Sequence, residues 1–228
     1  VPNPGFLGAD TFDYTITDAN GNSEAGTVTV IVTVPMPSPQ QAVVDAANSR
    51  LLVTDDSLRA IVAVNLASGA RTYLSDPTTP DAANPFGAPY GIAVDTAGNR
   101  ALVTDFVLDA VVAVDLATGA RTVLSDPVTP DAVNPLASPA AIAIDSAANR
   151  ALVVDAGLDA VIAVDLATGV RTVLSGATTP DDANAFSVPA GIAVDASNNR
   201  ALITDRGLSA VIAVDLATGA RTVLSDPV

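Results

Sequence analysis

The chain has 228 residues, a net charge of −15 and 49% apolar residues, which is ample for a folded core. It holds a single glutamate, its ten basic residues are all arginine, and it contains neither histidine nor cysteine. These absences exclude disulfides, thiolate zinc sites and histidine-dependent catalytic triads. The acidity disfavours nucleic acid as a partner, and no apolar run of roughly eighteen residues occurs, so we expect no membrane insertion.

Residues 1–34 show the two-residue alternation of a β-hairpin around a polar turn that contains glycine. Phe12, Tyr14 and Ile16 share one face of the first expected strand, and alternate valines from Val28 to Val34 line one face of the second. A lone hairpin is marginal in water, so we expect its apolar face to find a partner.

The turn of this hairpin offers oxygen ligands at every second position, which are Asp18, Asn20, Asn22 and Glu24. This spacing superficially suggests a calcium loop, but Gly21 is at the wrong position and the closing bidentate acid is missing. We therefore favour a plain hairpin turn and keep calcium binding as the alternative.

The stretch GADTFDYTITDANGNSEAGTVTVIV resembles the last two strands of the Ig-like or cadherin-like modules of bacterial surface proteins. The resemblance covers about thirty residues. It implies an extracellular or cell-surface location.

A proline-rich linker at 35–40 separates the hairpin from a repeat of fifty residues that fills 41–228. Aspartate, arginine and glycine recur in it without a slip, as at Asp95, Arg100, Gly119 and Arg121. The spacing predicts four blades at about 41–75, 91–125, 141–175 and 191–225.

Each unit predicts four short antiparallel strands, which in the second unit are residues 91–95, 100–105, 110–116 and 121–125. We call them strands a to d. Strand c, with Val111 to Val114, lacks polar alternation and should be buried on both faces. The predicted fold is all-β: propeller-type blades of four antiparallel strands preceded by a β-hairpin, with the closure of a ring left open.

The motif PYGIAVDTAGNRALVTD followed by AVVAVDLATG resembles the blade of NHL-type propellers, and the resemblance extends over all four units. It implies a propeller fold whose relatives serve as binding scaffolds, lyases or lactonase-like hydrolases. The chain lacks the histidines of related metal-dependent enzymes, so no catalytic residue is carried over.

Residues repeated in every blade should serve every blade alike. We expect Asp95 to order the a–b turn with Asn99, and Arg100 and Arg121 to pair with aspartates between blades. A repeated cation site is the alternative.

Positions that break the repeat are better candidates for a single binding site. They gather in the b–c turns and d–a loops, which should emerge on one rim of the blades, whereas the a–b and c–d turns are nearly invariant. Neutral drift of solvent-facing residues is the competing interpretation. The candidate ligand-binding residues are Asp56, Arg59, Phe86, Tyr90, Phe106, Asp109, Asp159, Phe186 and Arg206.

The long d–a loops carry oxygen ligands of the kind that hard cations prefer. In the first loop these are Asp76, Asp81 and Asn84, so calcium is the one cofactor that we consider. The same residues are also ordinary turn formers.

Three functional hypotheses follow. The first is a non-enzymatic, secreted or cell-surface bacterial module for binding, adhesion or assembly, whose partner is a protein, a glycan or another copy of the chain. The second is a structural subunit of an extracellular filament or layer joined through hairpin and blade edges. The third is a calcium-dependent hydrolase or lyase.

Overall fold

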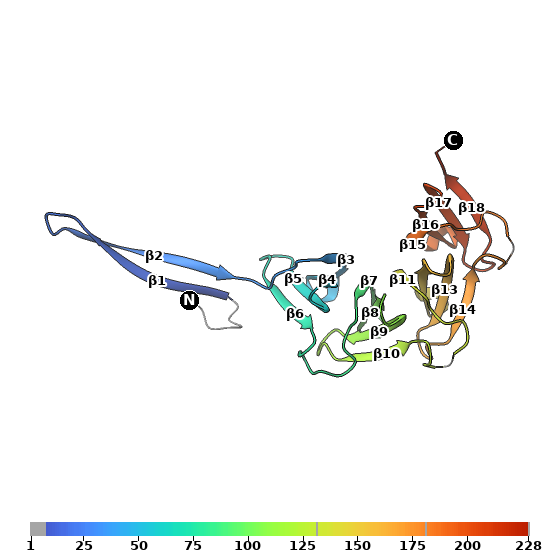
Figure 1. Cartoon of the computed structure of the whole chain (residues 1–228), viewed down its shortest axis with the longest axis horizontal. Coiled ribbons are helices and arrows are strands. Elements are labelled where there is room, and N and C mark those ends of the chain that lie inside the picture. The colour runs from blue at the N-terminus through green and yellow to red at the C-terminus, as the bar shows by residue number, and fades with distance from the viewer. Residues whose placement is uncertain (1–7, 131, 181, 228) are drawn as a thin grey trace.

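The computed structural model describes residues 8–130, 132–180 and 182–227, which form one two-stranded and four four-stranded antiparallel sheets (Figure 1). The hairpin consists of β1 (Gly8–Thr17) and β2 (Ser23–Val32), with Phe12 opposite Val28. Its two strands project away from the blades in Figure 1. The predicted hairpin is confirmed.

Four blades follow in chain order, each with its strands side by side in sequence order. The first blade contains β3 (Pro39–Asp45), β4 (Arg50–Asp55), β5 (Ala60–Asn65) and β6 (Arg71–Ser75). The second contains β7 (Pro89–Asp95), β8 (Arg100–Asp105), β9 (Ala110–Asp115) and β10 (Arg121–Ser125). The third contains β11 (Pro139–Asp145), β12 (Arg150–Asp155), β13 (Ala160–Asp165) and β14 (Arg171–Ser175). The fourth contains β15 (Pro189–Asp195), β16 (Arg200–Asp205), β17 (Ala210–Asp215) and β18 (Arg221–Ser225).

Short 3-10 turns join strands a and b in three blades, at η1 (Ala46–Asn48), η2 (Ser146–Ala148) and η3 (Ala196–Asn198). The inner strands of consecutive blades lie next to one another: β3 by β7, β7 by β11, and β11 by β15. In Figure 1 the fourth blade stands apart from the first, so the described blades form an open arc. The four-stranded blades are confirmed; with the hairpin they make five sheets, and within the described part of the chain the blades close no ring (Figure 1).

The apolar core lies between blades. Residues 110–114 of β9 are buried on both faces because the neighbouring blades cover them. Gly91 of the inner strand leaves room for the next blade, since a Cβ there would lie 2.7 Å from the Thr104 Oγ1 and closer still to the Ala140 carbonyl oxygen. Among the described residues no helix is long and apolar enough to cross a membrane.

Candidate functional site

The b–c turns and d–a loops do meet on one rim, and a buried aspartate joins them. The Asp105 side chain, at the end of β8, has no exposed surface. Its carboxylate accepts hydrogen bonds from the backbone of the d–a loop at Gly87 and Ala88, at 2.7 and 3.0 Å. It also accepts them from the b–c turn at Val107 and Leu108, at 3.1 and 3.0 Å. One carboxylate therefore sets the conformation of both variable segments of the second blade.

The other blades use the same device. Asp155 accepts from four backbone amides, Asp205 from three and Asp55 from two, always in the d–a or linker segment and in the b–c turn. All three side chains are buried. The sequence shows this aspartate only as one more repeated residue, and its role as a rim anchor was not predicted.

Large apolar side chains stand on this anchored rim. In the second blade Phe106 is 49% exposed and Val107 is 64% exposed, and Leu108 is half-exposed. The third and fourth blades present Leu158 and Leu208 at the position of Leu108. Exposed aromatic and aliphatic side chains on a fixed backbone favour recognition of an apolar surface.

Two of the predicted rim residues are not accessible there. Phe86 and Phe186 are buried between blades and belong to the apolar core. Their rings lie 5.7 and 5.5 Å from the guanidinium carbons of Arg121 and Arg221. Leu136 occupies the same position in the next loop, so aromatic variation here reflects packing between blades.

The remaining candidates are spread over all four blades, with one to three in each. Arg59, Phe106 and Arg206 are exposed, whereas Asp56, Tyr90, Asp109 and Asp159 are half-buried. The Tyr90 carbonyl accepts a hydrogen bond from the Thr54 hydroxyl of the preceding blade. Since consecutive blades lie side by side, the structure arranges these residues along one rim and does not gather them into one pocket.

The same rim has a groove that was not predicted from the sequence. It measures about 330 Å³ and lies in the third blade between Pro135 of one d–a loop, Leu158 of the b–c turn and Gly176 and Ala177 at the start of the next loop. The other blades have Asp-Pro where this blade has Gly176 and Ala177. This departure does not by itself mark the groove, because the fourth blade has an equivalent groove of about 360 Å³ beside Leu208, Asp226 and Pro227.

Asp109 and Asp159 face a carboxylate of the next blade. Burial and the nearby carboxylates of Asp155 and Asp105 raise the pKa of Asp109. Burial and the Asp205 carboxylate raise the pKa of Asp159, whose Oδ1 atom is buried without a hydrogen-bond partner among the described residues. Ionisation of both groups therefore opposes the packing of blades.

We expect the double substitution Asp109→Asn and Asp159→Asn to raise the melting temperature at about pH 7. A raised folded-state pKa contributes stability that is present below the unfolded value of about 3.9 and is lost as pH rises through the folded value. The gain should therefore shrink towards pH 3.5, as followed by circular dichroism. Asp115→Asn is the control, because hydrogen bonds from the side chain and backbone of Thr118 lower the pKa of Asp115. An equal gain at both pH values would contradict the assignment.

The residues predicted to hold calcium have other contacts. Asp76 Oδ1 accepts hydrogen bonds from the Thr78 backbone and hydroxyl and from the Thr79 backbone, and Asp81 Oδ1 accepts one from Ala83. The Asn84 side chain donates to the Arg121 carbonyl oxygen at 2.9 Å. Among the described residues no three acidic groups gather into a metal-binding cluster. These contacts fit the turn-former interpretation, and calcium binding stays an untested prediction.

The repeated arginine of strand d has a different partner from the one predicted. The Arg121 guanidinium donates to the Ser75 hydroxyl and to backbone carbonyls of the preceding d–a loop, and to no aspartate side chain in a described contact. Arg171 and Arg221 repeat the arrangement. This arginine shapes each d–a loop, so the predicted pairing was wrong although the structural role was right.

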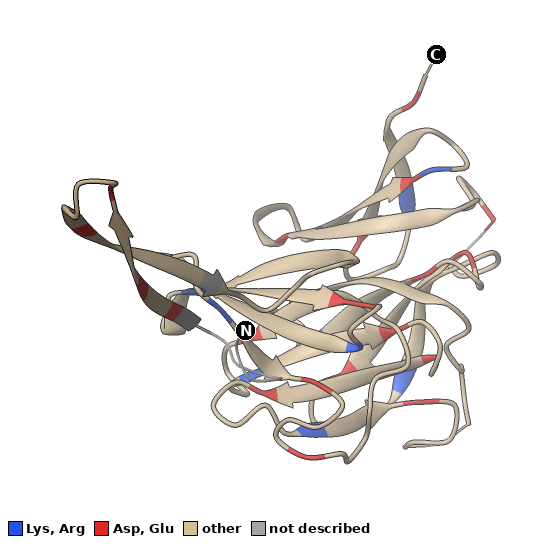
Figure 2. Ribbon diagram, turned by 60° about the vertical axis from the view of Figure 1, so that its left-hand side comes forward, with Lys and Arg blue, Asp and Glu red and all other residues tan. Residues whose placement is uncertain are grey.

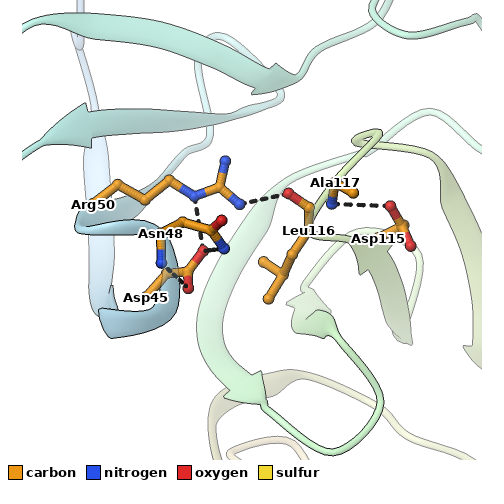
Figure 3. Close-up of polar contacts among 6 residues, drawn as sticks. All are labelled: Asp45, Asn48, Arg50, Asp115, Leu116 and Ala117. Atoms are coloured by element: carbon orange, nitrogen blue, oxygen red, sulfur yellow. Dashed lines mark hydrogen bonds and ion pairs between the residues drawn. The ribbon is translucent and has the colours of Figure 1, made fainter.

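The arginine at the start of strand b joins neighbouring blades (Figure 3). Arg50 pairs with Asp45 of its own blade at 2.7 Å and donates to the Leu116 carbonyl oxygen of the second blade. Arg100 and Arg150 make the same two contacts one and two blades later. Figure 2 shows acidic residues at turns and strand ends throughout the blades.

The turn and the apolar face of the hairpin lie away from the blades (Figure 1). The Asp18 carboxylate accepts hydrogen bonds from Asn22, both side chain and backbone, and from the Asn20 backbone, and these lower its pKa. This is the geometry of a hairpin turn, as favoured. The apolar residues of one face, Phe12, Tyr14, Ile16, Val28 and Val30, are all at least 37% exposed. The face therefore has no partner among the described residues.

Comparison with known proteins gives a family match for the hairpin segment. Residues 1–31 match the family described as bacterial Ig domain, and nothing among curated proteins matches the chain. The predicted Ig-like resemblance is supported over that segment. The match covers too little of the chain to assign the whole of it to the family.

Solved structures share the fold of the chain. A structure of unknown function from Bacteroides thetaiotaomicron is 13% identical with a TM-score of 0.63, and the match covers 94% of this chain and 50% of that one. A nidogen/laminin complex is 20% identical over 92% of this chain and 88% of that one, with a TM-score of 0.46. The first likeness supports propeller-like blades and shows the fold alone. The chain spans about half the length of that structure.

Proposed function

We propose that the chain is a non-enzymatic binding module of an extracellular or cell-surface bacterial protein, and that its blades recognise a partner through the rim of b–c turns and d–a loops. The partner is a protein or glycan that offers an apolar surface. The bacterial Ig match at 1–31 supports the location.

The observation that carries the proposal is the combination of a fixed backbone with variable, exposed side chains. Asp105 holds the turn at 106–108 through buried hydrogen bonds, while Phe106 and Val107 project into solvent. A fixed backbone lowers the entropy cost of binding, and aromatic anchors supply most of the affinity in many interfaces.

The test replaces the second turn by the third. In Phe106→Ala/Val107→Gly the turn acquires the residues Ala156 and Gly157 of the neighbouring blade, so the blade should fold unchanged. We expect at least about a tenfold loss of affinity for a partner found on a glycan array or a panel of purified matrix proteins, measured by surface plasmon resonance.

Val170→Ser is the matched control because Val170 is 41% exposed in a c–d turn, on the opposite rim. It should leave the affinity unchanged. Unaltered binding by the turn variant, or an equal loss in both variants, would overturn the proposal.

A further inference from the structure

The three interfaces between described blades share one set of contacts. An arginine of strand b donates to the carbonyl oxygen of a leucine in the next blade, which is Leu116, Leu166 or Leu216. These three leucines are 4–6% exposed. A strand-d arginine of the following blade lies in the d–a loop of the preceding one, with its Nη1 atom against a buried serine that is Ser75, Ser125 or Ser175.

A glycine completes each interface by permitting close approach. A Cβ on Gly119, Gly169 or Gly219 would collide with the carbonyl oxygen of Leu74, Leu124 or Leu174 of the preceding blade. Gly69 is the corresponding residue of the first blade, and nothing lies within 4 Å of a Cβ built there.

The fourth blade displays the donor half of this interface uncovered. Thr204 and Ser225 are exposed, although their counterparts Thr104 and Ser125 are fully buried. Leu224 is 46% exposed. A hollow of about 250 Å³ on this face is lined by Arg200, Ala213, Thr222 and Leu224 among others.

The first blade displays the acceptor half. Leu66 is 54% exposed, in contrast to Leu116, Leu166 and Leu216, and Val44 of the inner strand is 53% exposed. The Arg71 guanidinium donates to the Val34 carbonyl at 3.3 Å. This carbonyl corresponds to that of Asn84, which accepts from Arg121 in the second blade. The segment before the first blade thus supplies one carbonyl of the Arg71 site through Val34. No described residue of one copy takes the place that the Ser75 hydroxyl has at the Arg121 site.

We propose that the uncovered face of the fourth blade docks on the first blade of a second copy of this chain. By analogy with the internal interfaces, Arg200 donates to the partner copy's Leu66 carbonyl, and Ser225 completes the site of its Arg71. The Leu224 carbonyl then lies against Gly69. Within one copy the described residues leave the Arg71 site incomplete.

The occupant follows from the repeat itself. The three internal interfaces show what covers each type of face, and both end blades keep the residues that make those contacts. The two end faces stand apart in Figure 1, so the described residues of one copy do not cover either of them. Because the two faces differ, the contact is heterologous and generates a ring or a filament.

Gly69→Asn in the intact chain tests the docking. Asparagine tolerates the positive φ of 71° at this position, and its Cβ meets nothing within one chain, so the blade keeps its fold. In the docked pair the same Cβ collides with Leu224. Sedimentation velocity over a concentration series should show self-association of the wild-type chain and at least a tenfold weaker association of Gly69→Asn.

Gly21→Asn is the matched control, because Gly21 also has a positive φ, of 87°, and an equally open Cβ position, but lies at the hairpin tip. It should associate as the wild-type chain does. A wild-type monomer at every concentration would overturn the proposal, as would association that Gly69→Asn leaves intact or that Gly21→Asn weakens equally. The rim variant Phe106→Ala/Val107→Gly should associate normally, which separates this outcome from that of the proposed binding function.

Discussion

Replacing Arg121 by methionine should lower the free energy of unfolding by at least about 3 kcal/mol. The side chain is 4% exposed, and its guanidinium donates to backbone carbonyls at Asp76, Asp81 and Ala83, among others. Methionine keeps most of the stem volume but leaves these buried oxygens without donors. Equilibrium urea denaturation followed by circular dichroism measures the loss.

Arg71→Met is the matched control, because Arg71 at the equivalent position is half-buried and, among the described residues, donates a hydrogen bond to the Val34 carbonyl. We expect Arg71→Met to lower the free energy of unfolding by about 1 kcal/mol or less under conditions where the chain is monomeric. Equal losses of unfolding free energy in the two variants would contradict the role assigned to the buried Arg121 guanidinium.

Asp105→Ala should cost about 3 kcal/mol or more, because four backbone amides lose a charged acceptor at a position shielded from water. Asp115→Ala is the control. Its carboxylate also orders a turn, through Ala117 and Thr118, but that turn is exposed, so water replaces the lost acceptor. We expect a cost of about 1 kcal/mol there.

A comparable loss of unfolding free energy in both variants would contradict the difference in burial on which this prediction depends. Both costs are obtained from the same urea denaturation measurement as that of Arg121→Met.

The blades were predictable because their signals are local and repeated. Strands b and d of the second unit begin and end where the sequence indicated, and strand c ends one residue earlier, at Asp115. Strand a begins at Pro89, two residues before the predicted start. The open arc was not predictable, because a repeat specifies how blades contact one another and not how many are needed to close a ring.

The site was predictable in outline only. Variation between repeats identified the rim and the exposed Phe106, but it also selected Phe86, which is buried between blades. Sequence variation marks a change of environment and does not distinguish a ligand from a neighbouring blade. The partner of Arg121 was missed for a related reason, since backbone carbonyls of a distant loop leave no trace in residue identities.

We propose that repeated residues inside the blades hold a rigid rim that presents the variable side chains to a partner. Hydrogen–deuterium exchange of the wild-type chain and Asp105→Ala tests it most directly. The claim predicts that the amides of residues 106–108 exchange slowly in the wild-type chain, although their side chains are exposed, and that they lose protection in the variant while those of 156–158 keep it. Rapid exchange at 106–108 in the wild-type chain would contradict it.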